Sequence, residues 1–100
     1  MKFHITLEMK MLSKHAKVRL QQRAIPLFTI DLLLDIGVFE HRNNGLDLVY
    51  FNRRGKHEAI SLMKDYGLKQ IEHCLNAYLI KSSDGLIVTA GHRTKRINRN

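Results

Sequence analysis

The residues best suited to chemistry lie between positions 13 and 25. His15, Arg19 and Arg23 recur every four residues, which places them on one side of an α-helix. Their stripe overlaps the edge of an apolar stripe formed by Leu12, Ala16 and Leu20. A charge at the margin of a core is costly to desolvate without a partner, so the pattern predicts a cleft for an anion. Alternatively, the two arginines pair with acids such as Glu8 or Glu40 and brace the fold.

A second cluster follows Gly91, where the backbone is free to turn before His92 and Arg93. Histidine has an ordinary pKa of about 6.5 and can act as a general base or acid near neutrality. Arginine can bind phosphate with two parallel hydrogen bonds. Like-charge repulsion from Arg19 is expected to favour neutral His15 as the base, with His92 or a nearby cation at the leaving oxygen. Together the clusters match what RNA cleavage without a metal requires.

The overall charge agrees with a polyanionic partner. The chain has 100 residues, 17 Lys and Arg against nine Asp and Glu, and a formal net charge of +8. A surplus of this size favours nucleic acid through phosphate contacts and counterion release, although solubility alone could account for it. The residues that we assign to RNA binding beyond the catalytic candidates are Thr89, Lys95, Arg96, Arg99, Arg53 and Arg54.

Other site classes find little support in the sequence. Cys74 is the single cysteine, so an intrachain disulfide or a cysteine metal cluster is excluded. The histidines and acids show no metal-ligand spacing, which favours a mechanism without metal or cofactor. No window approaches about 20 uninterrupted apolar residues, and no continuous apolar signal core begins the chain, so we expect a cytoplasmic protein without a membrane span.

The remaining pattern predicts one α+β domain over residues 1–100. We expect strands at 2–8, 38–42, 46–52, 71–81 and 86–90, with helices at 13–25, 29–36 and 57–66; a strand at 58–63 is the alternative to the last helix. Asn43-Asn44-Gly45 predicts a tight hairpin turn, and the strand after it has two partly apolar faces, typical of a central strand. Gly37 is expected as a left-handed helix stop. Asp31 and Asp35 are expected on the exposed face of their helix.

The two clusters also carry a resemblance to a known family. Its matching motifs are Ser13-x-His15-Ala16-x-x-Arg19-x-x-x-Arg23-x-Ile25, the helix end Ile36-Gly37, the pair Tyr50-Phe51, and Ser83-Asp84-Gly85-Leu86-Ile87-Val88-Thr89 with His92-Arg93. Over about residues 12–96 the chain resembles a family of small uncharacterised bacterial proteins. That family is grouped with the barnase–EndoU–colicin–RelE superfold of metal-independent ribonuclease toxins.

The resemblance implies N-terminal helices packed on a four-stranded antiparallel sheet, with RNA cut at the sheet face. It implies a site made of His15, Arg19, Arg23, Thr89, His92 and Arg93. The leading hypothesis is therefore a ribonuclease toxin, or a relative of one, whose partner is an acidic antitoxin protein. Two alternatives stay open: a non-catalytic module that binds nucleic acid through the same basic surface, and a structural protein whose basic clusters are scaffold.

Overall fold

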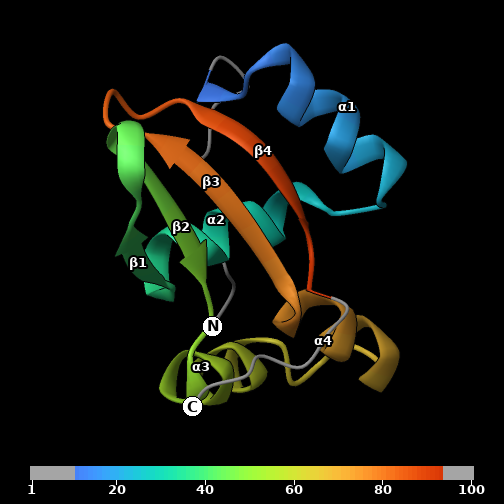
Figure 1. Cartoon of the computed structure of the whole chain (residues 1–100). Coiled ribbons are helices and arrows are strands. Elements are labelled where there is room, and N and C mark those ends of the chain that lie inside the picture. The colour runs from blue at the N-terminus through green and yellow to red at the C-terminus, as the bar shows by residue number, and fades with distance from the viewer. Residues whose placement is uncertain (1–10, 94–100) are drawn as a thin grey trace.

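The N-terminal helix α1 forms where the sequence predicts it. The computed structural model describes residues 11–93, and α1 spans Lys14–Gln22 within them (Figure 1). The Ser13 hydroxyl accepts a hydrogen bond from the Ala16 amide at 2.9 Å, which caps the first turn. The chain then turns before Pro26. The strand expected at 2–8 lies outside the described residues.

Four antiparallel strands form a meander with the order β1-β2-β3-β4. Their bounds are β1 Val38–His41, β2 Leu46–Tyr50, β3 Ala77–Ser82 and β4 Ile87–His92. The β1–β2 hairpin turns through a 3-10 segment, Asn43–Gly45, in which Asn44 has φ 65° and Gly45 has φ 71°. The hairpin, the central position of β2 and the α+β class are confirmed.

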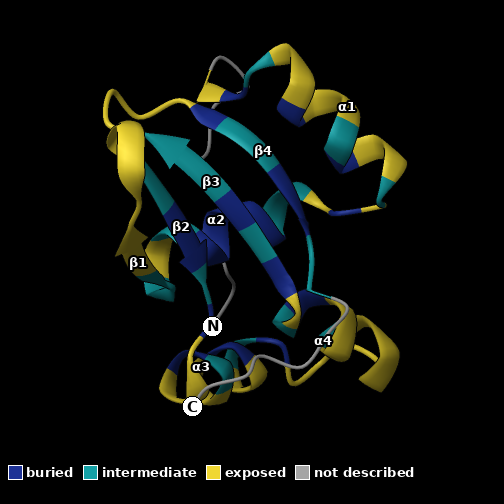
Figure 2. Cartoon of the chain, viewed as in Figure 1, coloured by how far each residue is buried: buried dark blue, intermediate teal, exposed yellow. Residues whose placement is uncertain are grey.

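The core lies between one face of the sheet and helix α2, Leu27–Ile36. Val49 and Leu79 of the two central strands are fully buried in the same cluster as Ile30 and Leu33 of the helix. Figure 2 shows buried stretches on β2, β3 and α2 in dark blue. Helix α1 lies along β4, with its apolar stripe of Leu12, Ala16 and Leu20 buried against this core as predicted. The N-terminal helices therefore pack on the sheet.

Two further helices, α3 (Arg53–Leu62) and α4 (Leu68–Leu75), lie together at one end of the sheet (Figure 1). Helix α3 begins four residues before the helix expected at 57–66, because the Asn52 side chain accepts from the Gly55 amide at 2.8 Å and caps it. The strand expected at 71–81 is wrong over its first half. Cys74 is buried on one side of α4, with Ile71 and Leu75 packed against the core, and this spacing is helical.

Two local predictions about α2 are wrong. Asp31 is buried, with 7% of its surface exposed, because the helix is covered on more than one side. Gly37 is extended, with φ −77°, and not left-handed. A Cβ there would lie 3.0 Å from Val49 Cγ1 and 2.5 Å from the Leu33 carbonyl oxygen, so glycine permits a close approach of α2 to β2. Within residues 11–93, no helix has the length and apolar character needed to cross a membrane.

Candidate functional site

The stripe on α1 divides into two residues that contact each other, His15 and Arg19, and an arginine anchored to the sheet, Arg23. Arg19 Nε donates to His15 Nε2 at 3.2 Å, and Arg19 Nη1 donates to Gln22 Oε1 at 3.1 Å. An imidazole nitrogen accepts a hydrogen bond only when it carries no proton, so this contact requires neutral His15 with its proton on Nδ1. His15 is exposed, whereas Arg19 is half-buried.

Arg23 turns away from this pair to the free edge of β4. Its Nη1 donates to the Ala90 carbonyl oxygen at 3.0 Å, while the Ser13 hydroxyl donates to the Val88 carbonyl at 3.0 Å. The two ends of α1 therefore donate hydrogen bonds to two outward-facing carbonyls of the edge strand β4. Unpaired carbonyls on an edge strand can otherwise pair with a strand of another chain. Among the described residues, no carboxylate lies within 4.0 Å of Arg23, so its charge is not neutralised by an acid there.

Gly91 makes room for the Arg23 guanidinium on the side of the sheet away from α2. A Cβ at this position would lie 2.9 Å from Tyr78 Oη and would collide with Arg23 Nη1. Tyr78 is the cross-strand partner of Gly91, and Tyr50 is the next residue in the same row. The sequence predicts that Gly91 lets the backbone turn. In the structure, the missing side chain instead lets the Arg23 guanidinium pack beside the Tyr78 hydroxyl.

Arg93 extends the same row. Its guanidinium carbon lies 4.3 Å from the centroid of the Tyr50 ring, within the range of a cation–π contact. The backbone amide of Arg93 donates to the Asn76 carbonyl at 2.7 Å, which fixes the chain as it leaves β4. Arg53 and Arg54 follow Tyr50 closely and are exposed in the first turn of α3. They therefore lie at the same end of the sheet as Arg93.

His92 has a neighbour that sequence reasoning missed. The rings of His92 and His73 lie 3.9 Å apart between centroids, at 43°. Burial lowers the pKa of His92 below its ordinary 6.5, and the nearby His73 and Arg23 lower it further. Its Nε2 atom is buried and has no hydrogen-bond partner among the described residues, which agrees with a neutral ring. His73 was expected in a strand, and nothing in its local sequence indicates the contact.

We call this part of the molecule the basic end, defined by Arg23, Arg53, Arg54, His73, His92 and Arg93. It unites Arg23 of the first predicted cluster with His92 and Arg93 of the second. His15 and Arg19 lie further along α1, and no contact in the described part of the chain links His15 to His92. Thr89 lies opposite Ile80 on the same face as Gly91. Lys95, Arg96 and Arg99 fall outside the described residues.

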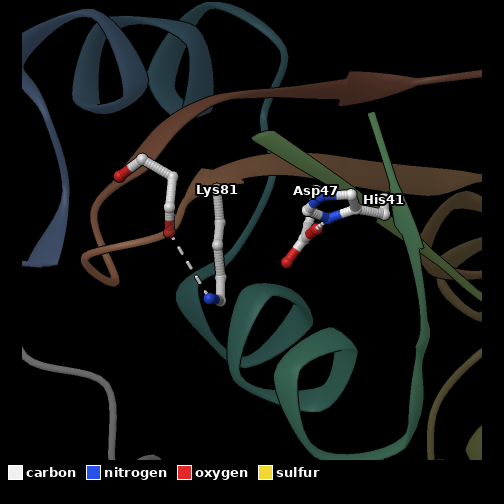
Figure 3. Close-up of polar contacts among 4 residues, drawn as sticks. His41, Asp47 and Lys81 are labelled. Atoms are coloured by element: carbon white, nitrogen blue, oxygen red, sulfur yellow. Dashed lines mark hydrogen bonds and ion pairs between the residues drawn. The ribbon is translucent and has the colours of Figure 1, made fainter. Parts of the chain in front are cut away.

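A second polar row crosses the opposite end of the sheet (Figure 3). His41 Nδ1 lies 2.8 Å from Asp47 Oδ1, and Lys81 stands beside Asp47 on the neighbouring strand. The Lys81 ammonium contacts the Ser82 carbonyl at 3.5 Å and lies 5.5 Å from the Phe39 ring centroid. The His41–Asp47 contact joins β1 to β2, and Lys81 of β3 lies near Phe39 of β1, so these side chains stabilise the packing of the strands. Residues 11–93 contain no group of three or more His, Cys, Asp or Glu side chains that could hold a metal ion.

Comparisons of the chain with protein-family models, with curated proteins and with solved structures each found no match. The resemblance to the ribonuclease-toxin superfold therefore stays a prediction that rests on the motifs quoted for it.

Proposed function

We propose that the protein binds RNA at the basic end and cuts it without a metal. The observation that carries the proposal is the pairing of two fixed cations with an imidazole of lowered pKa at the end of β4. Arg23 is fixed by the Ala90 carbonyl and Arg93 by the Tyr50 ring. His92 directly precedes Arg93 and points to the α2 side of the sheet, whereas Arg93 lies over Tyr50 on the other side. Burial, His73 and Arg23 lower the pKa of His92, which favours the neutral ring near pH 7.

These groups suit cleavage by the RNA's own 2′-hydroxyl. A neutral imidazole accepts the 2′-hydroxyl proton, the oxygen attacks the adjacent phosphorus, and the bond to the 5′-oxygen breaks as that oxygen takes a proton from an acid. The products are a 2′,3′-cyclic phosphate and a 5′-hydroxyl. The lowered pKa of His92 keeps more of its ring in the neutral, proton-accepting form, so we assign it the role of base, which reverses the order expected from the sequence. His73, which is exposed, is the nearest candidate acid.

The arginines supply the charge that the reaction needs. A guanidinium is always protonated and can contact two phosphate oxygens at once, so it stabilises the negative charge that accumulates on the pentavalent phosphorus. Arg53 and Arg54 extend the cationic surface to neighbouring phosphates. His15 and Arg19 would bind the strand further along α1. An acidic protein could mask the same surface, as expected for an antitoxin in a bacterial toxin–antitoxin pair, and the cytoplasm would be the compartment for both.

The test is incubation of the purified protein with a labelled single-stranded RNA in EDTA. We expect cleavage by the wild-type protein, and a loss of about 100-fold or more in His92→Ala, the range for one general acid or base. His41→Ala is the matched control, because His41 pairs with Asp47 at the other end of the sheet. Intact RNA in every reaction would overturn the proposal that the protein is a ribonuclease. Salt-sensitive binding with no cleavage would favour the non-catalytic module, in which the two arginines hold phosphates only.

A further inference from the structure

We propose that the groove between the start of α2 and helix α4 holds one nucleobase of the bound RNA. The groove has a volume of about 590 Å³ and is lined by residues from two stretches, 24–29 and 66–76. This volume falls within the range of about 300–1,000 Å³ found for sites that bind small molecules. The inference rests on the proposed function, because it assigns a base subsite to the same strand that the basic end would hold.

One wall of the groove is aromatic. The rings of Phe28 and Tyr66 lie 5.3 Å apart between centroids, with 37° between their planes. Tyr66 is 46% exposed, so a large part of its surface remains available to a ligand. Its backbone amide donates to the Met63 carbonyl at 2.8 Å, which fixes the residue after α3. Any base can stack on such a ring, because every base has a flat π face.

The inner wall contains a buried hydroxyl, that of Thr29, whose neighbour is the Cys74 thiol. Thr29 is 1% exposed and lines the groove; its Oγ1 has no nitrogen or oxygen partner among the described residues and interacts only with the Cys74 thiol there. Most buried polar side chains in proteins do have a partner, because an unmade hydrogen bond is costly. The neighbouring Cys74 thiol, whose pKa burial raises, is a weak hydrogen-bonding group and a poor substitute. The edge of a base carries strong donors and acceptors for this hydroxyl.

The groove is continuous with the basic end. His73 lines the groove and also contacts the His92 ring at 3.9 Å. Ala24, at the other side of the groove, directly follows Arg23. A nucleotide with its base in the groove would therefore present its phosphate to His73 and His92. The lining also includes Lys69 and Gln70, and such polar groups suit a base better than a lipid chain.

The experiment compares two probes on the full-length protein in EDTA. The first probe is each of the four uncharged nucleosides, and its binding is monitored by NMR through the amide chemical shifts of Thr29, Tyr66 and His73. The second probe is a short single-stranded RNA, compared with the same backbone carrying abasic positions; the affinity of each for the protein is measured by fluorescence anisotropy. The variants are Tyr66→Leu and Thr29→Val. Phe39→Leu is the matched control, since Phe39 is also a 46% exposed aromatic residue but lies on β1.

We expect at least one nucleoside to shift the groove signals, and the intact RNA to bind more tightly than the abasic strand. Tyr66→Leu should weaken intact RNA by about 5- to 100-fold, the range for loss of one stacked base, and leave abasic binding unchanged. Thr29→Val should also remove the preference for bases, while its urea midpoint stays equal or rises because the buried hydroxyl that is lost had only a weakly bonding thiol beside it. A merely structural threonine would not combine these two effects.

The outcomes separate this inference from the proposed function. Equal binding of intact and abasic RNA, with no nucleoside shifts, overturns the base groove and leaves RNA binding at the basic end intact. Nucleoside shifts in the groove without RNA binding overturn the proposed function and keep the groove as a nucleoside site. If Phe39→Leu weakens intact RNA as much as Tyr66→Leu does, the groove assignment is wrong.

Discussion

Replacing Gly91 with alanine tests how Arg23 is held at the edge of β4. The added Cβ would collide with Arg23 Nη1 and approach Tyr78 Oη to 2.9 Å, so both side-chain ends must move and the Arg23–Ala90 bond breaks. A hydrogen bond to a charged group contributes about 1.5–3 kcal/mol, and the lower part of that range applies because Arg23 is only half-buried. Alanine in a strand regains about 0.5–1 kcal/mol over glycine. We therefore expect a net loss of about 1 kcal/mol.

Urea unfolding of four proteins measures this loss and its cause: wild type, Gly91→Ala, Arg23→Ala and the double variant. With Arg23 truncated, the guanidinium is absent and Tyr78 can shift into its space. Gly91→Ala should then be neutral or stabilising by up to about 1 kcal/mol, so the two sites should couple by about 1–2 kcal/mol. Equal destabilisation by Gly91→Ala in both backgrounds would refute the reasoning, because the clash would then not involve Arg23.

Three further predictions concern the scaffold and its titration. Ser13→Ala should lower the free energy of unfolding by about 1–2 kcal/mol, since it removes both the helix cap and the bond to Val88; an unchanged urea midpoint would contradict this. Because the folded-state pKa of His92 lies below 6.5, the unfolded chain binds the proton more tightly, and stability should fall as pH drops below about 6.5. His92→Asn should remove that part of the slope, and a slope identical to wild type would count against a buried neutral ring. Asn44→Val should cost about 1 kcal/mol or more at φ 65°, whereas Asn44→Gly should be tolerated; thermal midpoints that rank the two the other way would exclude a turn-specific role.

The elements that the sequence predicts well are those whose determinants are local. Ser13 caps α1 through a contact three residues away, and Asn44 with Gly45 closes the hairpin through backbone conformations that these residue types favour. The helix at 68–75 was missed because an apolar run beside a true strand has no distinctive period until the partners of Cys74 are known. The burial of Asp31 likewise depends on what covers α2, which the sequence of that helix does not encode.

The site was predictable only in part for the same reason. Residue types and four-residue spacing singled out Arg23, and the run after Gly91 singled out His92 and Arg93. That Arg23 leaves the His15 stripe depends on the carbonyl of Ala90, 67 positions away. The contact between His92 and His73 brings together two distant histidines across a strand and a helix, and only the tertiary packing creates it.

The central claim is that the basic end carries out RNA cleavage by attack of a 2′-hydroxyl. Its most direct test is end-group analysis by mass spectrometry of an RNA incubated in EDTA with the wild-type protein, beside the same strand with 2′-deoxyribose at each position. We predict fragments ending in 2′,3′-cyclic phosphate and 5′-hydroxyl from the RNA, and none from the deoxy strand. Intact RNA, or equal cutting of both strands, would contradict the account.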